Sequence, residues 1–129
     1  MRNIIFISDL HIGDGSSKDD FNQDELLESL LEDWKDLANP ELVIVGDGFE
    51  ILESSVVRNA GPDNFWEILK KLDGEPIENI QHKHPGVFKA LQKFPGKIWY
   101  VIGNHDYYIY KNEKLKNKLF ELFPNMEIV

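Results

Sequence analysis

Three apolar segments of the sequence each end in polar side chains of the kinds that bind divalent metal ions. Carboxylate, amide and imidazole groups together suit manganese, iron or zinc better than a calcium site, which has oxygen ligands only. Two such ions about 4 Å apart serve phosphoryl chemistry, because they activate a water between them and neutralise the phosphate oxygens. The candidate residues follow segments 4–7, 42–45 and 98–102, and they are Asp9, His11, Asp47, Asn104, His105 and Asp106.

The three apolar segments are predicted to be neighbouring strands of a parallel sheet. Each segment is continuously apolar rather than alternating, which is typical of strands that are covered on both faces. Helical patterns separate the segments, and this alternation favours an α/β fold. Parallel strands share a direction, so their carboxyl ends lie along one edge of the sheet, where ligands bind. The polar residues should therefore converge at that edge although they are distant in the sequence.

Amphipathic patterns occupy most of the sequence between the predicted strands. Residues 73–83 are predicted to form a loop, and residues 126–129 begin a further strand. Residues 54–97, which lie between the second and third polar groups, could form a cap over a substrate. Apolar residues at spacings of three and four predict helices over residues 22–37, 65–72, 85–94 and 115–123.

The composition limits the class of protein. A chain of 129 residues with 42% hydrophobic content forms one domain with an adequate core. The net charge of −9 argues against a broad surface for nucleic acid. The sequence has no cysteine, so any metal must be bound by oxygen and nitrogen. The N-terminal apolar segment is too short for a signal peptide or a membrane span, and we expect a cytoplasmic protein.

The three polar segments together resemble the calcineurin-like metallophosphoesterases. The segments ISDLHIGDG, VIVGDGFEI and VIGNHD are similar to the first three blocks of that family, which read Asp-x-His, Gly-Asp-x-x-Asp/Glu and Gly-Asn-His-Asp/Glu. The resemblance implies half of an α/β/β/α sandwich with a mainly parallel sheet and flanking helices. Small bacterial or archaeal phosphoesterases look closer to this sequence than large phosphoprotein phosphatases do.

The resemblance also implies two divalent metal ions and a reaction. Asp9 and His11 would bind the first ion, Asp47 would bridge both ions, and Asn104 would bind the second. We expect manganese, with iron, zinc, nickel and magnesium as alternatives. A metal-bridging hydroxide would attack a phosphodiester, phosphomonoester or pyrophosphate bond. The substrate would be a phosphorylated small molecule or a nucleotide-type compound.

Catalytic roles follow from the same resemblance. His105 would act on the phosphate as transition-state stabiliser or general acid, and Asp106 would orient it. Glu50 matches the last acidic position of its block, and such a residue is more often structural than in contact with substrate. Gly48 stands where a bulkier apolar residue is expected, which predicts a looser loop.

Two further histidine blocks that usually follow in the family are missing from this sequence. After His11 and His105 are assigned, only His82 and His84 remain, and we expect them in an exposed loop. We therefore expect a single domain over residues 1–129 that is truncated at its C-terminus and has little activity alone. An apolar sheet face would then be left for self-association or for the missing half. A non-catalytic metal-binding or protein-interaction module that retains the fold is the alternative.

Overall fold

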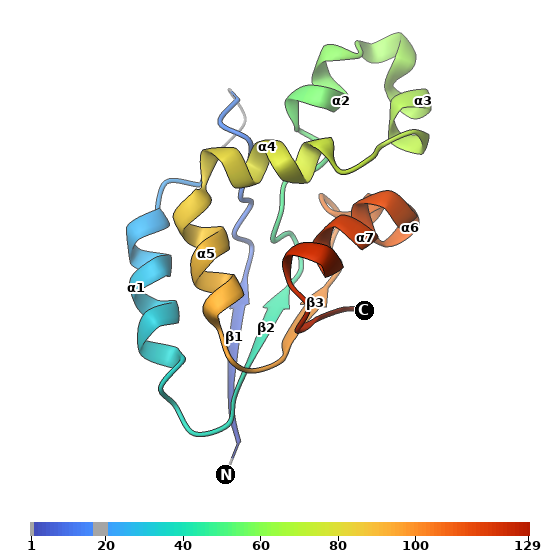
Figure 1. The fold of residues 1–129 in the computed structure, drawn as a ribbon. Coiled ribbons are helices and arrows are strands. Elements are labelled where there is room, and N and C mark those ends of the chain that lie inside the picture. The colour runs from blue at the N-terminus through green and yellow to red at the C-terminus, as the bar shows by residue number, and fades with distance from the viewer. Residues whose placement is uncertain (1, 17–20) are drawn as a thin grey trace.

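The computed structural model describes residues 2–16 and 21–129, which form a parallel sheet with helices packed against one face (Figure 1). The sheet has four strands, and each strand pairs in parallel with the next one along the chain. The predicted α/β fold with a parallel sheet is confirmed. The strands are β1 (Asn3–Ser8), β2 (Pro40–Val45), β3 (Ile98–Val101) and β4 (Met126–Ile128).

Helices connect the strands, and the four predicted helical regions are all helical with small differences at their ends. The predicted loop over residues 73–83 is wrong, because residues 75–83 form a helix. Its Pro76 lies in the first turn, where a fixed φ favours a helix, and Ile77 and Ile80 are buried. The helices are α1 (Asp24–Trp34), α2 (Ser55–Asn59), the 3-10 helix η1 (Pro62–Asn64), α3 (Phe65–Lys70), α4 (Glu75–Lys83), α5 (Pro85–Lys93), α6 (Tyr107–Lys111) and α7 (Glu113–Leu122).

The core lies between one face of the sheet and the helices α1, α5 and α7. In β2, Leu42 and Ile44 point into this core and are almost fully buried. The helices contribute apolar side chains such as Leu31, Phe88 and Leu119, each no more than 1% exposed. Parallel crossovers that run in strand order place all these helices on the same side of the sheet.

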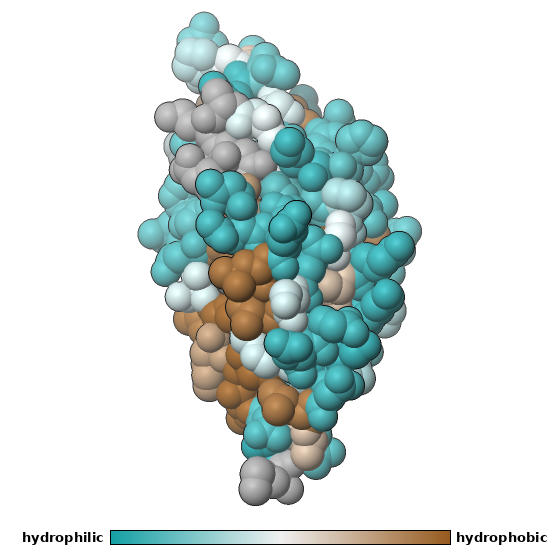
Figure 2. Space-filling view, turned by 90° about the vertical axis from the view of Figure 1, so that its left-hand side faces the viewer, coloured by the Kyte–Doolittle hydropathy of each residue, from teal (hydrophilic) through white to brown (hydrophobic). Residues whose placement is uncertain are grey.

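The other face of the sheet is open in the part of the chain that the structure describes. Ile4 and Phe6 of β1 are 43% and 67% exposed, and Val45 of β2 is 42% exposed. Coverage of both faces was predicted from the continuous apolar strands, and the described residues cover only one. Figure 2 shows the side of the molecule that carries β1 and α1, where apolar side chains form a band between polar regions. Leu26 of α1 is also 55% exposed.

Two short helices, α2 and α3, project from the carboxyl end of the sheet at the upper right of Figure 1. They belong to the region that was predicted as a cap, whereas α4 and α5 of the same region bury Ile80 and Phe88 in the main core. Among the described residues, no helix has the length and apolar character needed to cross a membrane.

Candidate active site

The loops that follow β1 and β2 run side by side beyond the sheet. The N–H of His11 donates to the carbonyl of Asp47 at 2.8 Å, and the N–H of Ile12 donates to that of Gly48 at 2.8 Å. The N–H of Glu50 returns to the carbonyl of Ile12 at 2.9 Å. The two loops therefore form a fixed pair, and residues 9–11 lie next to residues 47–50 because the parallel pairing continues past the strand ends.

The loop after β3 is attached to the same pair. The N–H of His105 donates to Asp47 Oδ1 at 2.8 Å, and the carbonyl of His105 accepts from the N–H groups of Ile51 and Leu52 at 3.3 Å. A Cβ atom on Gly103 would lie 2.5 Å from Asp47 Oδ1, so this close approach requires glycine. All three polar segments thus meet at one edge of the sheet, as the sequence predicts.

Three of the predicted metal ligands lie close enough together to bind one ion. The donor atoms of Asp9, His11 and Asp47 all lie within 4.8 Å of one another. Their φ angles are +53°, +50° and +51°, a left-handed conformation that non-glycine residues seldom adopt. A strained backbone conformation of this kind persists only where the surrounding structure imposes it, which is often the case at functional sites. In this structure it accompanies the close approach of the three side chains. Asn104 is exposed at the same edge, on the β3 loop.

This donor set fits a divalent metal ion. Asp9 and Asp47 offer carboxylate oxygens, and His11 offers Nε2, which lies 3.9 Å from Asp9 Oδ1. Mixed oxygen and nitrogen ligands of this kind suit first-row transition metals. The side chain of Asp9 is 72% exposed, so an ion could enter from solvent.

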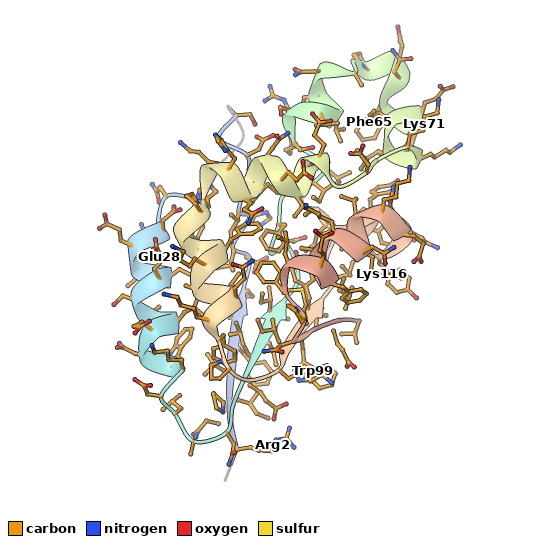
Figure 3. The ribbon with its side chains drawn as sticks, viewed as in Figure 1. Arg2, Glu28, Phe65, Lys71, Trp99 and Lys116 are labelled. Atoms are coloured by element: carbon orange, nitrogen blue, oxygen red, sulfur yellow. The ribbon has the colours of Figure 1, made fainter. Side chains whose placement is uncertain are left out.

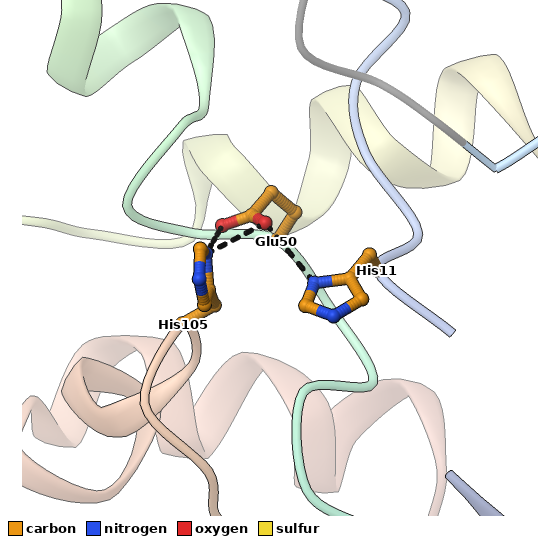
Figure 4. Close-up of side chains that lie close together, drawn as sticks. All are labelled: His11, Glu50 and His105. Carbon is orange, nitrogen blue, oxygen red and sulfur yellow. Dashed lines mark hydrogen bonds and ion pairs between the residues drawn. The ribbon is translucent and has the colours of Figure 1, made fainter. Parts of the chain in front are cut away.

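Glu50 is a buried carboxylate that contacts both histidines of the site (Figure 4). Its side chain is 6% exposed, and one of its oxygens lies 3.3 Å from His11 Nδ1. Both of its oxygens lie 2.9 Å from His105 Nδ1. An ionised carboxylate only accepts hydrogen bonds, so each Nδ1 carries the proton. Nε2 of His11 is then left free to bind a metal ion.

His105 is held beside His11 with its ring partly open to solvent. The two ring centroids are 5.1 Å apart with the planes nearly perpendicular, and the His105 side chain is 40% exposed. The hydrogen bond to Glu50 raises the pKa of His105 above its usual value, although partial burial opposes this. The imidazolium form therefore persists to a higher pH than usual, and in that form Nε2 can donate a hydrogen bond to an anion.

Asp106 makes its contacts away from the His105 ring. Its Oδ2 accepts from the hydroxyl of Tyr100 at 2.5 Å and from the N–H of Gly48 at 3.0 Å, and its Oδ1 accepts from the N–H of Gly103 at 2.7 Å. Burial raises the pKa of this carboxyl, while these hydrogen bonds lower it. Asp106 therefore ties the β2 and β3 loops together, and the contact that orients His105 comes from Glu50.

Tyr100 is a residue of the site region that the sequence reading missed. It was read as one member of an apolar strand, yet its hydroxyl accepts from the N–H of Phe49 at 2.7 Å and donates to Asp106. A Cβ atom on Gly48 would lie 2.8 Å from that hydroxyl. The predicted looseness of the loop at Gly48 is wrong, because the tyrosine fills the space and hydrogen bonds fix the backbone.

The remaining two histidines lie on or next to α4. His82 is exposed, and neither His82 nor His84 belongs to a group of potential metal ligands among the described residues. His84 is 2% exposed, and its Nδ1 lies 2.5 Å from Asp24 Oδ2. The prediction of an exposed loop is therefore wrong: His82 is exposed but lies in α4, and the buried ring of His84 joins the α4–α5 junction to the start of α1.

Comparison with known protein families gives a match that covers nearly the whole chain. Residues 2–128 match the family described as calcineurin-like phosphoesterase. Comparisons with curated proteins and with solved structures gave no significant match.

Proposed function

The chain belongs to the calcineurin-like phosphoesterase family, and on this basis we propose that it hydrolyses phosphoester bonds with the help of two divalent metal ions, manganese in the first place. Asp9 and His11 would hold one ion, Asp47 would contact both, and Asn104 would contribute to the second. When bound, such ions activate water and neutralise charge on the phosphate oxygens. The substrate would be a phosphorylated small molecule or a nucleotide-type compound.

His105 would act on the phosphate directly. Its Nδ1–H is held by Glu50, so its Nε2 faces away from that carboxylate and is available to a phosphate oxygen. The raised pKa keeps the ring protonated to a higher pH than usual, which suits a group that donates a hydrogen bond or a proton as the ester bond breaks. Glu50 is a positioning residue in this scheme, because it acts through the two histidines.

The observation that carries the proposal is the convergence of Asp9, His11 and Asp47. These residues come from loops after different strands, and all three have left-handed backbone conformations. An exposed acidic group by itself would not require such strain. Three strained donors within 4.8 Å of one another, with the ring of His105 beside them, support a metal-dependent reaction of an anionic substrate.

The test is hydrolysis of bis(4-nitrophenyl) phosphate by the purified chain with manganese. We expect a low rate that EDTA abolishes and that Asp9→Asn removes. Asp63→Asn is the matched control, because Asp63 is exposed on η1 and lies outside the groups of potential metal ligands. A rate that survives both EDTA and Asp9→Asn would contradict the proposal. No manganese-dependent rate at all would favour the non-catalytic module.

We also propose that the chain self-associates through the open face of the sheet. The support is the group of exposed apolar residues Ile4, Phe6, Val45 and Val129. Covering each 100 Å² of such surface contributes roughly 2.5 kcal/mol. At the amino end of this face, the pairs Arg2–Glu41 and Lys97–Glu127 place both signs of charge side by side, and such an arrangement is compatible with contact between two copies.

A further inference from the structure

A cleft lies between the end of α3 and the start of α6 and α7, in a part of the chain to which the proposed reaction assigns no role. Its volume is about 500 Å³, which is within the range of small-molecule sites. Two of the lining residues, Leu69 and Leu72, are apolar and almost fully buried at its base. The residues that line it are Leu69, Lys70, Lys71, Leu72, Tyr107, Tyr108, Lys111, Asn112, Glu113 and Lys114.

The cleft is positively charged although the whole chain has a net charge of −9. Its lining contains four lysines and one glutamate. Glu113 forms an ion pair with Lys116, outside the cleft lining, at 3.3 Å. Figure 3 labels Lys71 beside α3 and Lys116 on α7, on the two sides of this region.

The cleft lysines are little neutralised by other residues. Lys71 lies 4.0 Å from Glu67, and both side chains are about three-quarters exposed, so this pair is weak. Among the described residues, Lys70 and Lys114 have no carboxylate within ion-pair distance, and Lys111 contacts the ring of Tyr107 at 5.9 Å. A cleft with several free ammonium groups favours an anionic ligand, and phosphate is the anion that lysine commonly binds as a point charge.

The cleft also has a surface for an apolar or aromatic group. Tyr107 is 43% exposed and Tyr108 is partly buried beside it, with their rings 5.5 Å apart. These rings could contact a flat aromatic or apolar group of a ligand. The ligand that fits is therefore an organic phosphate rather than an inorganic ion.

Tyr107 connects the cleft to the candidate active site. It follows Asp106 directly in the sequence, and it also lines a neighbouring pocket together with Gly103 and Asn104. One side chain thus borders both the cleft and the loop that carries Asn104 and His105. A ligand in the cleft would lie alongside that loop.

We propose that this cleft binds a second phosphate group of the substrate together with the aromatic or apolar body that carries it, while the bond to be hydrolysed lies at the metal-binding edge. The substrate class is therefore an organic compound with at least two phosphate groups. This inference rests on the proposed function, because the cleft by itself favours an organic phosphate but does not show that this ligand is hydrolysed.

The test uses ADP, which combines two phosphates with an aromatic base, in the presence of EDTA so that no metal ion contributes. Calorimetry should show that ADP binds more tightly than either adenosine or inorganic pyrophosphate. The double variant Lys70→Gln, Lys114→Gln should weaken ADP binding at least about tenfold, because the cleft loses half of its lysine charges. Higher sodium chloride should weaken it further.

The matched control is Lys89→Gln, Lys93→Gln, which removes two exposed lysines from α5. An equal loss of ADP binding in this control, no binding by the unchanged chain, or equal binding of pyrophosphate and ADP would overturn the proposal. Because the binding assay contains EDTA, its outcome is independent of turnover. Manganese-dependent hydrolysis without ADP binding would contradict only the proposal that the cleft binds substrate. ADP binding without hydrolysis would contradict only the proposed reaction.

Discussion

Replacing Glu50 by Gln tests whether one buried carboxylate sets the state of both histidines. The amide has nearly the same size as the carboxylate, so the packing around this 6% exposed side chain should survive. However, a glutamine has one acceptor oxygen and one NH₂ group. When its oxygen accepts from Nδ1 of one histidine, its NH₂ faces Nδ1 of the other, which must then lose its proton.

The expected effects follow from the contact distances. Nδ1 of His105 lies 2.9 Å from both Glu50 oxygens, whereas Nδ1 of His11 is 3.3 Å from one, so His105 should depend more strongly on the carboxylate. Without the carboxylate, the pKa of His105 should fall towards its usual value, because its largest raising cause is removed while partial burial, which lowers the pKa, remains. Changes to groups that orient metal ligands typically cost about 10- to 100-fold in metal affinity or activity. We expect Glu50→Gln to lose metal affinity and activity by a factor of this size.

The assay is an NMR titration of the histidine rings in metal-free protein, with Glu121→Gln as the control because Glu121 is exposed on α7. The pKa of His105 should lie above its usual value in the unchanged chain and in the control, and it should be lower in Glu50→Gln. A folded pKa above the unfolded value also means that His105 contributes stability below pH 6.5, which is lost as the pH rises through the folded value. An unchanged His105 titration in Glu50→Gln would refute the reasoning.

Two further predictions concern His105 itself and the open sheet face. His105→Ala should lower kcat by roughly 10² or more, as expected for a general acid or charge-stabilising group. The amount of bound metal, measured by elemental analysis, should stay nearly constant. A parallel loss of metal would instead show that His105 is a metal ligand. Phe6→Lys should reduce self-association measured by light scattering, because Phe6 is 67% exposed on the open face, whereas Phe120→Lys on α7, where Phe120 is 38% exposed, should not. An unchanged chain that is monomeric at every concentration would contradict the second prediction.

The parts of the fold that were predictable have strong local signals. The strands are apolar runs, and α1, α5 and α7 have apolar residues at helical spacing, so their types follow from sequence. Helix α4 was missed because its only buried residues are Pro76, Ile77 and Ile80, a short stripe that is stabilised by tertiary packing rather than by local propensity.

Convergence of the polar segments was also predictable, because parallel strands bring their carboxyl ends to one edge. Which carboxylate contacts which histidine was not. Asp106 is adjacent to His105 in the sequence, but its side chain turns inward to Tyr100, and Glu50 reaches His105 from the β2 loop. Such contacts depend on the paths of three loops, and no spacing within a single loop encodes them. The burial of His84 against Asp24 likewise joins residues 60 positions apart.

The central claim is that Asp9, His11 and Asp47 form a metal site at the edge of the sheet, and manganese calorimetry tests it most directly. The unchanged chain should bind manganese, and Asp47→Asn should remove that binding because a carboxylate ligand loses its charge. The amide oxygen can still accept from the N–H of His105, so the fold should be retained. Asp63→Asn should bind as the unchanged chain does. Equal manganese binding in Asp47→Asn and in the unchanged chain would contradict the account.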